Sequence, residues 1–375
     1  MKRCAAALLL WGCYAPSAPS GAPCDPAAPT CPDGQACLPA AGGGHACSGA
    51  PGGDPDPDAG TDGPPGLGHV RTASGWSARV LHDFSTKFTY VPIDFVDGAE
   101  MYSNQPDFMF VLRPPFNEAL AILAGRVVFE LTATTFTRHD YSGHAPNTAG
   151  LPDHLRGGTY VPNLDNGGPA VLLSSSSASG GDGTFRVTEQ WAISSDRTNN
   201  NTRAILWDPT GAFDATGKAD GYLGTMGGVI PRAAGPMGAV IIPGDTKTMH
   251  LAGANLLLTR QLQTAPDKVA LLEVTGAPYV EKPIAESTSI ELADGPAPAP
   301  HPAWAIVDRN RLVLLRADGS LETVAESLDG SFGWQAAAVA APPHALAGTS
   351  APIVYILEGN RGRSIDRVLA LEAPP

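Results

Sequence analysis

Histidines and acidic residues gather in one segment of this chain. His139 and Asp140 are followed after three residues by His144, and Asp153 and His154 come soon afterwards. Imidazole and carboxylate groups are protein ligands for Zn²⁺ and similar ions. Glycines and prolines make the segment irregular, and no H-x-x-x-H pair on a helix supports a metal site. We therefore name His139, His144 and His154 as candidate metal ligands, with surface-loop histidines that bind nothing as the competing interpretation.

Other catalytic patterns are incomplete. Nucleophilic hydrolysis often uses a serine in a G-x-S-x-G turn. The nearest segments, Gly75–Arg79 and Gly330–Gly333, do not complete that pattern. We therefore assign no catalytic residue and expect no cofactor.

The cysteines are confined to the start of the chain. All six lie before residue 48, and Cys24, Cys31, Cys37 and Cys47 form an even set in a Gly/Pro/Ala-rich stretch. Such a set in an exported protein predicts two disulfides, with three possible connectivities. Zinc is the alternative, but the spacings lack paired C-x2-C motifs. The stretch Cys31–Cys37 resembles the C-P-x-G-x-x-C turn of cysteine-rich modules in bacterial exported lipoproteins, which implies a structural module over residues 14–48.

The first thirteen residues have the pattern of an export signal. Lys2 and Arg3 form a positive start, and the short apolar stretch from Ala5 to Trp11 follows. The segment Leu10–Cys13 resembles the lipobox of bacterial lipoproteins, which implies a lipid on Cys13. The alternative is an ordinary secretory signal that is cut within residues 15–22. We therefore expect an outer-membrane or cell-surface location through a lipid anchor on Cys13, or else a soluble periplasmic or secreted protein.

A solvated linker is predicted over residues 49–67. Asp54, Asp56 and Asp58 alternate there as in a calcium loop, but that loop needs glycine at its sixth position and glutamate at its twelfth. Ala59 and Pro65 stand at those positions. Prolines and charges of one sign favour an extended spacer instead. The spacer separates the cysteine-rich module from a domain over residues 68–375.

Composition and charge limit the partners of the 375-residue chain. The formal net charge is −13, so a polyanion is repelled and nucleic acid is an unexpected partner. Beyond the export signal, no apolar stretch reaches the length of about 18 residues that a membrane span requires. Charged residues make up only 16% of the chain, which also holds 43 glycines and 36 prolines. This composition favours many short strands joined by turns.

The large domain shows repeated groups of short apolar runs. The clearest is Ala303–Val324, in which a turn at Asp308–Arg311 and an Asp318–Gly319 pair separate three runs. Asp-Gly between such runs is a strong hairpin signal, so the segment predicts a three-stranded meander. Similar groups start roughly 50 to 70 residues apart, somewhat longer than the repeats of propeller blades.

One repeat carries a family resemblance. Its parts are Trp207–Phe213, Thr216–Gly217, Pro231–Ala233, Ala239–Pro243 and Leu251–Gly253. Together they resemble one kelch-type blade, and the resemblance implies a degenerate β-propeller. We expect an all-β domain, a propeller of roughly five to seven blades, whose first strand near Val70–Phe84 pairs with the last run at Arg367–Leu371. A two-sheet β-sandwich is the alternative. Some kelch-like propellers host a copper-radical oxidase that needs a cysteine, and none follows Cys47.

These observations favour a binding protein over an enzyme. Loops on a rigid scaffold often carry function. We expect an envelope protein whose propeller binds a protein or a glycan. The alternative is a secreted hydrolase or lyase with a loop site near residues 139–154.

Overall fold

The computed structural model describes fifteen segments of the chain, and the chain divides into two compact units, Met1–Asp62 and Gly63–Pro375. The segments are residues 35–39, 45–49, 67–83, 106–141, 155–164, 167–175, 183–198, 202–208, 221–232, 240–253, 255–275, 279–295, 303–347, 351–360 and 365–374. None of them contains a helix long and apolar enough to cross a membrane.

The first unit contains one described hairpin. Strands β1 (Gln35–Pro39) and β2 (His45–Gly49) pair antiparallel, and Cys37 lies opposite Cys47 in their backbone register. The other expected features of this part of the chain, Cys13, Cys24, Cys31 and most of the linker, lie outside the described residues. The disulfide pairing therefore stays a prediction.

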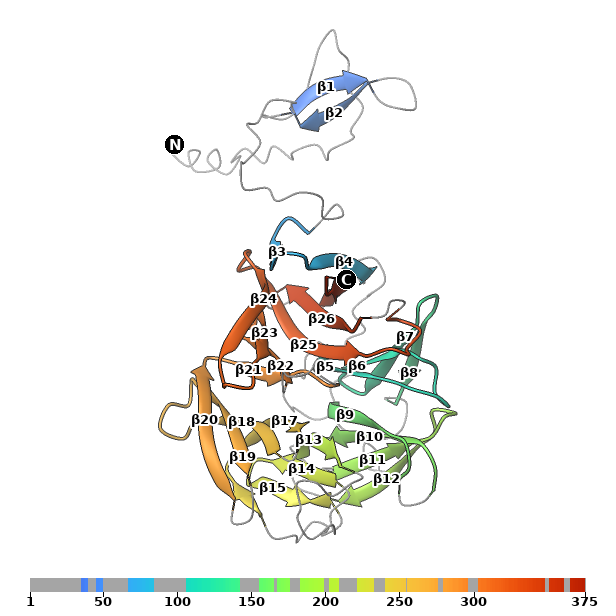
Figure 1. Cartoon of the computed structure of the whole chain (residues 1–375). Helices are drawn as coiled ribbons and strands as arrows, with labels where there is room; N and C mark the ends of the chain where they lie inside the picture. The colour runs from blue at the N-terminus through green and yellow to red at the C-terminus, as the bar shows by residue number, and fades with distance from the viewer. Residues whose placement is uncertain are drawn as a thin grey trace, which may run out of the picture. The chain divides into compact units, whose positions relative to one another are not determined.

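The second unit is all-β, and its strands form six antiparallel sheets, or blades (Figure 1). Blade 1 contains β5 (Pro106–Val111), β6 (Leu120–Ala124), β7 (Val127–Leu131) and β8 (Phe136–Asp140). Blade 2 contains β9 (Leu155–Val161), β10 (Ala170–Ser175), β11 (Gly183–Val187) and β12 (Ile193–Thr198). Blade 3 contains β13 (Thr202–Trp207), β14 (Gly221–Thr225), β15 (Gly228–Pro231) and β16 (Ile242–Pro243).

The remaining blades follow the same order. Blade 4 contains β17 (Thr246–Ala252), β18 (Asn255–Gln261), β19 (Val269–Thr275) and β20 (Val280–Ser287). Blade 5 contains β21 (Ile290–Leu292), β22 (Ala303–Val307), β23 (Arg311–Leu315), β24 (Leu321–Ser327) and β3 (Val70–Thr72). Blade 6 contains β25 (Phe332–Ala340), β26 (Ile353–Asn360), β27 (Ile365–Glu372) and β4 (Ser77–Asp83).

The first strand of each blade lies at the centre of the ring. Neighbouring inner strands contact one another from β25 to β5, β9, β13, β17 and β21. A parallel bridge between Asp294, just after β21, and Ala338 of β25 completes the circle. The domain is thus a six-blade β-propeller, within the expected range, and the two-sheet sandwich was wrong.

Each blade is buried on both faces, which explains the continuous apolar runs in the sequence. In β18, Leu256 and Leu258 pack with side chains of blade 3, whereas Leu257 packs with side chains of blade 5. Successive side chains of a strand point to opposite faces, so a strand between two neighbours needs apolar residues at every position. The six buried apolar clusters of the described residues each lie between two neighbouring blades.

The predicted meander over Ala303–Val324 is confirmed as β22, β23 and β24. Asp308 and Arg309 have φ values of 54° and 57°, which suits a turn with two left-handed central residues. Gly319 has a φ of 84°, and the Asp318 carboxylate accepts hydrogen bonds from the backbone N–H and the hydroxyl of Ser320. The Asp-Gly pair therefore fixes this turn by its local chemistry.

The kelch-type segment does not coincide with one blade. Trp207 is the last residue of β13 in blade 3, whereas Leu251 and Ala252 belong to β17 of blade 4. Residues 209–220 and 233–239 between them lie outside the described residues. The propeller fold is established, and the kelch resemblance stays a prediction.

The start of the domain closes the ring, as the sequence predicted. Strand β4 pairs with β27 as the outer strand of blade 6, and β3 pairs with β24 as the outer strand of blade 5. A buried carboxylate joins this segment to blade 6. Glu358, which is fully buried, accepts hydrogen bonds from Trp334 Nε1 at 2.9 Å and Arg367 Nε at 2.5 Å. Its Oε1 also lies 2.8 Å from His69 Nε2, just before β3.

Replacing Glu358 with glutamine should destabilise the propeller strongly. The substitution leaves the Arg367 guanidinium in the interior without its anion, and breaking a buried ion pair in this way typically costs about 3–5 kcal/mol. Chemical denaturation followed by tryptophan fluorescence measures the loss. Glu322→Gln is the matched control, because its pair with Arg316 is exposed and should contribute at most about 1 kcal/mol. Equal effects of the two substitutions would contradict a role for Glu358 in closure.

Candidate functional site

Asp294 holds three blades together at the centre of the ring. Its backbone N–H donates to Ala337 O at 3.2 Å, and its carbonyl accepts from Val339 N at 2.7 Å, both in β25 of blade 6. Its side-chain Oδ2 accepts from the backbone N–H of Val111, at the end of β5 in blade 1, at 3.2 Å. A residue of blade 5 thus supplies the partners that the open edges of two other inner strands require.

A cavity of about 130 Å³ opens beside Asp294, and we call it the axial cavity. This is room for several water molecules or a small organic molecule. Its lining comes from the ends of the inner strands of blades 1, 2, 5 and 6 and consists of Val111, Arg113, Thr159, Tyr160, Asp294, Gly295 and Val339.

The Asp294 carboxyl is the main titratable group of the axial cavity. Burial disfavours its charged form and raises its pKa from 3.8 to about 6. The backbone N–H of Val111 and the positive charge of Arg113 act in the opposite direction but do not offset the burial. The carboxyl is therefore mostly ionised at neutral pH and takes up a proton in mildly acidic solution.

Arg113 and Tyr160 supply the other polar groups of the axial cavity. The Tyr160 hydroxyl donates to Pro114 O at 2.6 Å, which ties β9 to the segment after β5. Burial raises the pKa of the Tyr160 phenol, so the group stays a neutral donor. Arg113 is partly buried, and no ion pair joins it to Asp294 or to any other residue that the structure describes.

Gly295 shapes the wall of the axial cavity by having no side chain. Its φ is +100°, and a Cβ at this position would lie 2.4 Å from Val339 O. Only glycine fits this backbone conformation without displacing β25.

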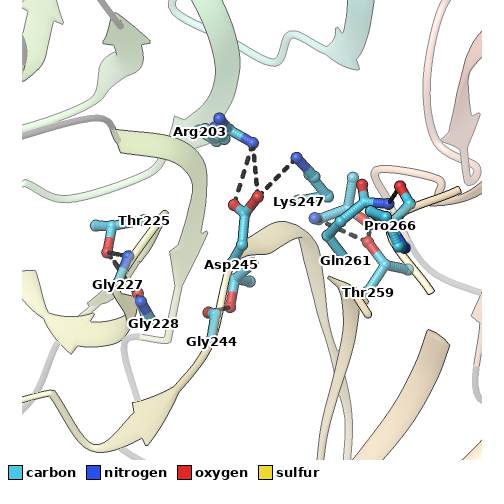
Figure 2. A network of polar contacts seen from close by, with 12 residues as sticks. Arg203, Thr225, Gly227, Gly228, Gly244, Asp245, Lys247, Thr259, Gln261 and Pro266 are labelled. Atoms are coloured by element: carbon cyan, nitrogen blue, oxygen red, sulfur yellow. Dashed lines mark hydrogen bonds and ion pairs between the residues drawn. The ribbon is translucent and has the colours of Figure 1, made fainter. Parts of the chain in front are cut away.

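A second polar network lies where the inner strands β13 and β17 begin. Arg203 Nη1 donates to both carboxylate oxygens of Asp245 at 3.1 Å, and Lys247 Nζ donates to Oδ2 at 2.9 Å. Figure 2 shows both cations pointing toward the Asp245 carboxylate. All three side chains keep about a quarter of their surface exposed, so the network joins blades 3 and 4 at a solvated edge and leaves no charge without a partner.

His139, the described member of the predicted metal set, is held by neighbours. Its ring stacks on Trp191 with centroids 3.8 Å apart, and its Nε2 lies 3.1 Å from Glu130 Oε2. Burial alone would raise the pKa of Glu130, but hydrogen bonds from His139 and Asn117 lower it overall. No group of three or more possible metal ligands occurs among the described residues. His144 and His154 lie outside those residues, so the metal site stays a prediction.

The residues of the axial cavity carry no signal that sequence reasoning could use. Asp294 and Gly295 form an Asp-Gly pair after a short apolar run, which indicates only a turn. Arg113 precedes a Pro-Pro pair, and Tyr160 lies inside a strand. These residues come together only because the ring brings the inner strands to one axis.

Asp294→Asn should remove one contribution to the pH dependence of stability. The Asp294 carboxyl binds its proton more tightly in the native state than in the unfolded chain, where its pKa is near 3.8. The stabilisation that this difference supplies is therefore complete below pH 3.8 and is lost as the pH rises through about 6. The loss amounts to about 3 kcal/mol at most. Asparagine keeps an acceptor for Val111 N–H, so the variant should be the more stable protein at pH 8 and lose that advantage near pH 4.

Denaturant titrations of both proteins between pH 4 and 8 measure this difference. Asp267→Asn is the control, because Asp267 is exposed and lies outside the axial cavity. A difference between wild type and Asp294→Asn that stays constant across this range would contradict the raised pKa.

Comparisons with known proteins place the chain among structures of low sequence identity. No protein-family model and no curated protein matches the chain. The PQQ-bound aldose sugar dehydrogenase of Streptomyces coelicolor is 15% identical, with a TM-score of 0.46 over 80% of this chain and 99% of that chain. A structure described as glucose dehydrogenase is 12% identical, with a TM-score of 0.45 over 79% and 99%. The β-propeller domain of Cps50 (Swd1) from Myceliophteria thermophila is 10% identical, with a TM-score of 0.39 over 72% and 83%.

Proposed function

We propose that this protein is an exported, lipid-anchored binding protein whose propeller holds a small polar group in the axial cavity. The group is either a small molecule or the end of a larger envelope partner, a glycan or a protein. The export signal and the lipobox-like segment ending at Cys13 support the location. The ligand site rests on Asp294 and its surroundings.

The observation that carries the proposal is a half-buried carboxyl with spare hydrogen-bonding capacity. Asp294 Oδ2 has one donor, the Val111 N–H, and Oδ1 has none among the described residues. A carboxylate has about four acceptor sites, and a charge that is partly removed from water is costly unless donors fill them. The axial cavity gives a ligand access to these sites, and Arg113 and Thr159 also line it.

The exposed apolar side chains favour the axial cavity over a docking face. Among the described residues, the large exposed ones are Met226, Val240, Val280 and Leu328. They belong to three different blades, and apolar side chains scattered in this way are normal for a protein surface.

Binding also fits the axial cavity better than hydrolysis does. A hydrolase or lyase needs at least two groups that share the proton transfers. In the axial cavity Asp294 is suited to exchange a proton near neutral pH, but the Tyr160 hydroxyl is directed to Pro114 O and its pKa is raised. The loop site near residues 139–154 falls mostly outside the described residues, so the enzyme alternative stays a prediction.

A ligand screen tests the binding site. The purified chain is melted with a panel of small sugars, polyols, amino acids, amines and carboxylates, and hits are measured by calorimetry. A ligand should raise the melting temperature by mass action. Its affinity should fall about tenfold or more in Asp294→Asn, since a hydrogen bond to a charged group contributes about 1.5–3 kcal/mol. Arg316→Gln, at an exposed residue that does not line the axial cavity, should bind as wild type does. If a ligand binds Asp294→Asn with the same affinity as wild type, its binding site lies elsewhere.

Removing Cys13 tests the anchor. In Cys13→Ser the acylated thiol is lost, so the protein should move from the detergent phase to the aqueous phase in a phase-separation assay. Cys4→Ser is the matched control, because Cys4 lies within the export signal and should not alter the partitioning. Identical partitioning of wild type and Cys13→Ser would refute the lipid on Cys13.

A further inference from the structure

Asp294 and Arg113 are opposite charges that line one cavity without pairing to each other. Elsewhere in the propeller, buried opposite charges meet directly. Arg232 Nη2 lies 2.8 Å from Asp196 Oδ1, and both side chains are almost fully buried. In the axial cavity no such ion pair occurs, although Arg113 is close enough to lower the pKa of Asp294.

Each of the two charges selects its own partner group. A carboxylate with free acceptor sites binds an ammonium group through charge-assisted hydrogen bonds. A guanidinium is a planar set of donors that matches a carboxylate in two parallel hydrogen bonds. Resting on the binding function proposed above, we infer that the ligand is a small zwitterion of the α-amino acid class, with its ammonium on Asp294 and its carboxylate on Arg113.

Charge balance favours the zwitterion over a simple ion. An amine alone would pair with Asp294 and leave Arg113 without an anion, and a carboxylate alone would do the reverse. Uncompensated charge in a partly buried site is costly. A zwitterion satisfies both groups and adds no net charge to the axial cavity.

Size and wall chemistry limit the side chain of the ligand. The axial cavity holds about 130 Å³, and Val111 and Val339 form its apolar wall. Gly295 presents no side chain there. Thr159, a neutral polar residue, also lines the axial cavity. Glycine, alanine and serine fit these limits, whereas long or aromatic amino acids exceed them.

Calorimetric titration of the purified full chain tests the inference. The ligands are alanine and serine, with acetate, methylamine and glycerol as fragments of their chemistry. Alanine or serine should bind at least about tenfold more tightly than acetate or methylamine, because each fragment makes only one of the two charged contacts. Phenylalanine should not bind, since the space is too small.

The variants separate the two contacts. Asp294→Asn should weaken the binding of methylamine and alanine and leave the affinity for acetate unchanged. Arg113→Gln should weaken the binding of acetate and alanine and leave the affinity for methylamine unchanged. Arg113→Lys keeps the positive charge but lacks the planar guanidinium, so it should reduce the affinity for acetate and alanine less than Arg113→Gln does. Thermal melts of each variant confirm that it folds, and the comparison of the ligands on wild type holds without any variant.

Three outcomes would overturn the inference in different ways. If glycerol or a sugar from the wider screen binds at Asp294 and the amino acids do not, the binding function stands and the zwitterion is wrong. If phenylalanine binds as tightly as alanine, the site is not the axial cavity. If neither these ligands nor the wider screen gives a complex that depends on Asp294, the inference and the proposed function both fail.

Discussion

The structure depends on burial of both faces of every blade. A single four-stranded sheet with leucines on both faces, such as β17–β20, would expose one apolar face or both to water if it stood alone. Each such side chain gains about 1.5–3 kcal/mol from burial, so the sheets are stable only as neighbours of one another. The ring must therefore close, and β4 closes it by pairing with β27 across most of the chain length.

Closure also explains where the buried charges lie. Glu358 with Arg367, and Asp196 with Arg232, sit at joints within or between blades, where strand ends leave polar groups in the interior. Asp196 also accepts from the Thr184 hydroxyl, so each of its oxygens has a donor. Fully satisfied pairs of this kind add specificity to an interface that leucine, valine and alanine side chains otherwise fill, since apolar contacts have no preferred direction.

The axial cavity follows from the same geometry. Six inner strands point their open edges toward one axis, and their backbone donors need partners. Asp294 accepts from the backbone N–H of Val111 in β5 and of Val339 in β25, and it donates its own backbone N–H to Ala337 O of β25. Its carboxyl is thereby held in a site that water reaches only partly. The raised pKa and the spare acceptor sites are both consequences of this position. A residue that helps to close the ring is thus also the residue on which the proposed ligand site rests.

Features that depend on near neighbours in the chain could be predicted from the residue pattern alone. The Asp318–Gly319 turn, the meander over residues 303–324, the all-β class and the pairing of the first strand with the last all follow from local pattern and from the need to close a ring. The candidate site, in contrast, depends on contacts between blades that are distant in the sequence. Val111 and Asp294 are separated by 183 positions, and no local pattern links them. These two residues come into contact because of the number of blades and because their strands end at the same part of the axis. Both features depend on packing between sheets. The stacking of the His139 ring on Trp191, which lies in a loop of blade 2, is likewise a contact between blades that no local sequence pattern indicates.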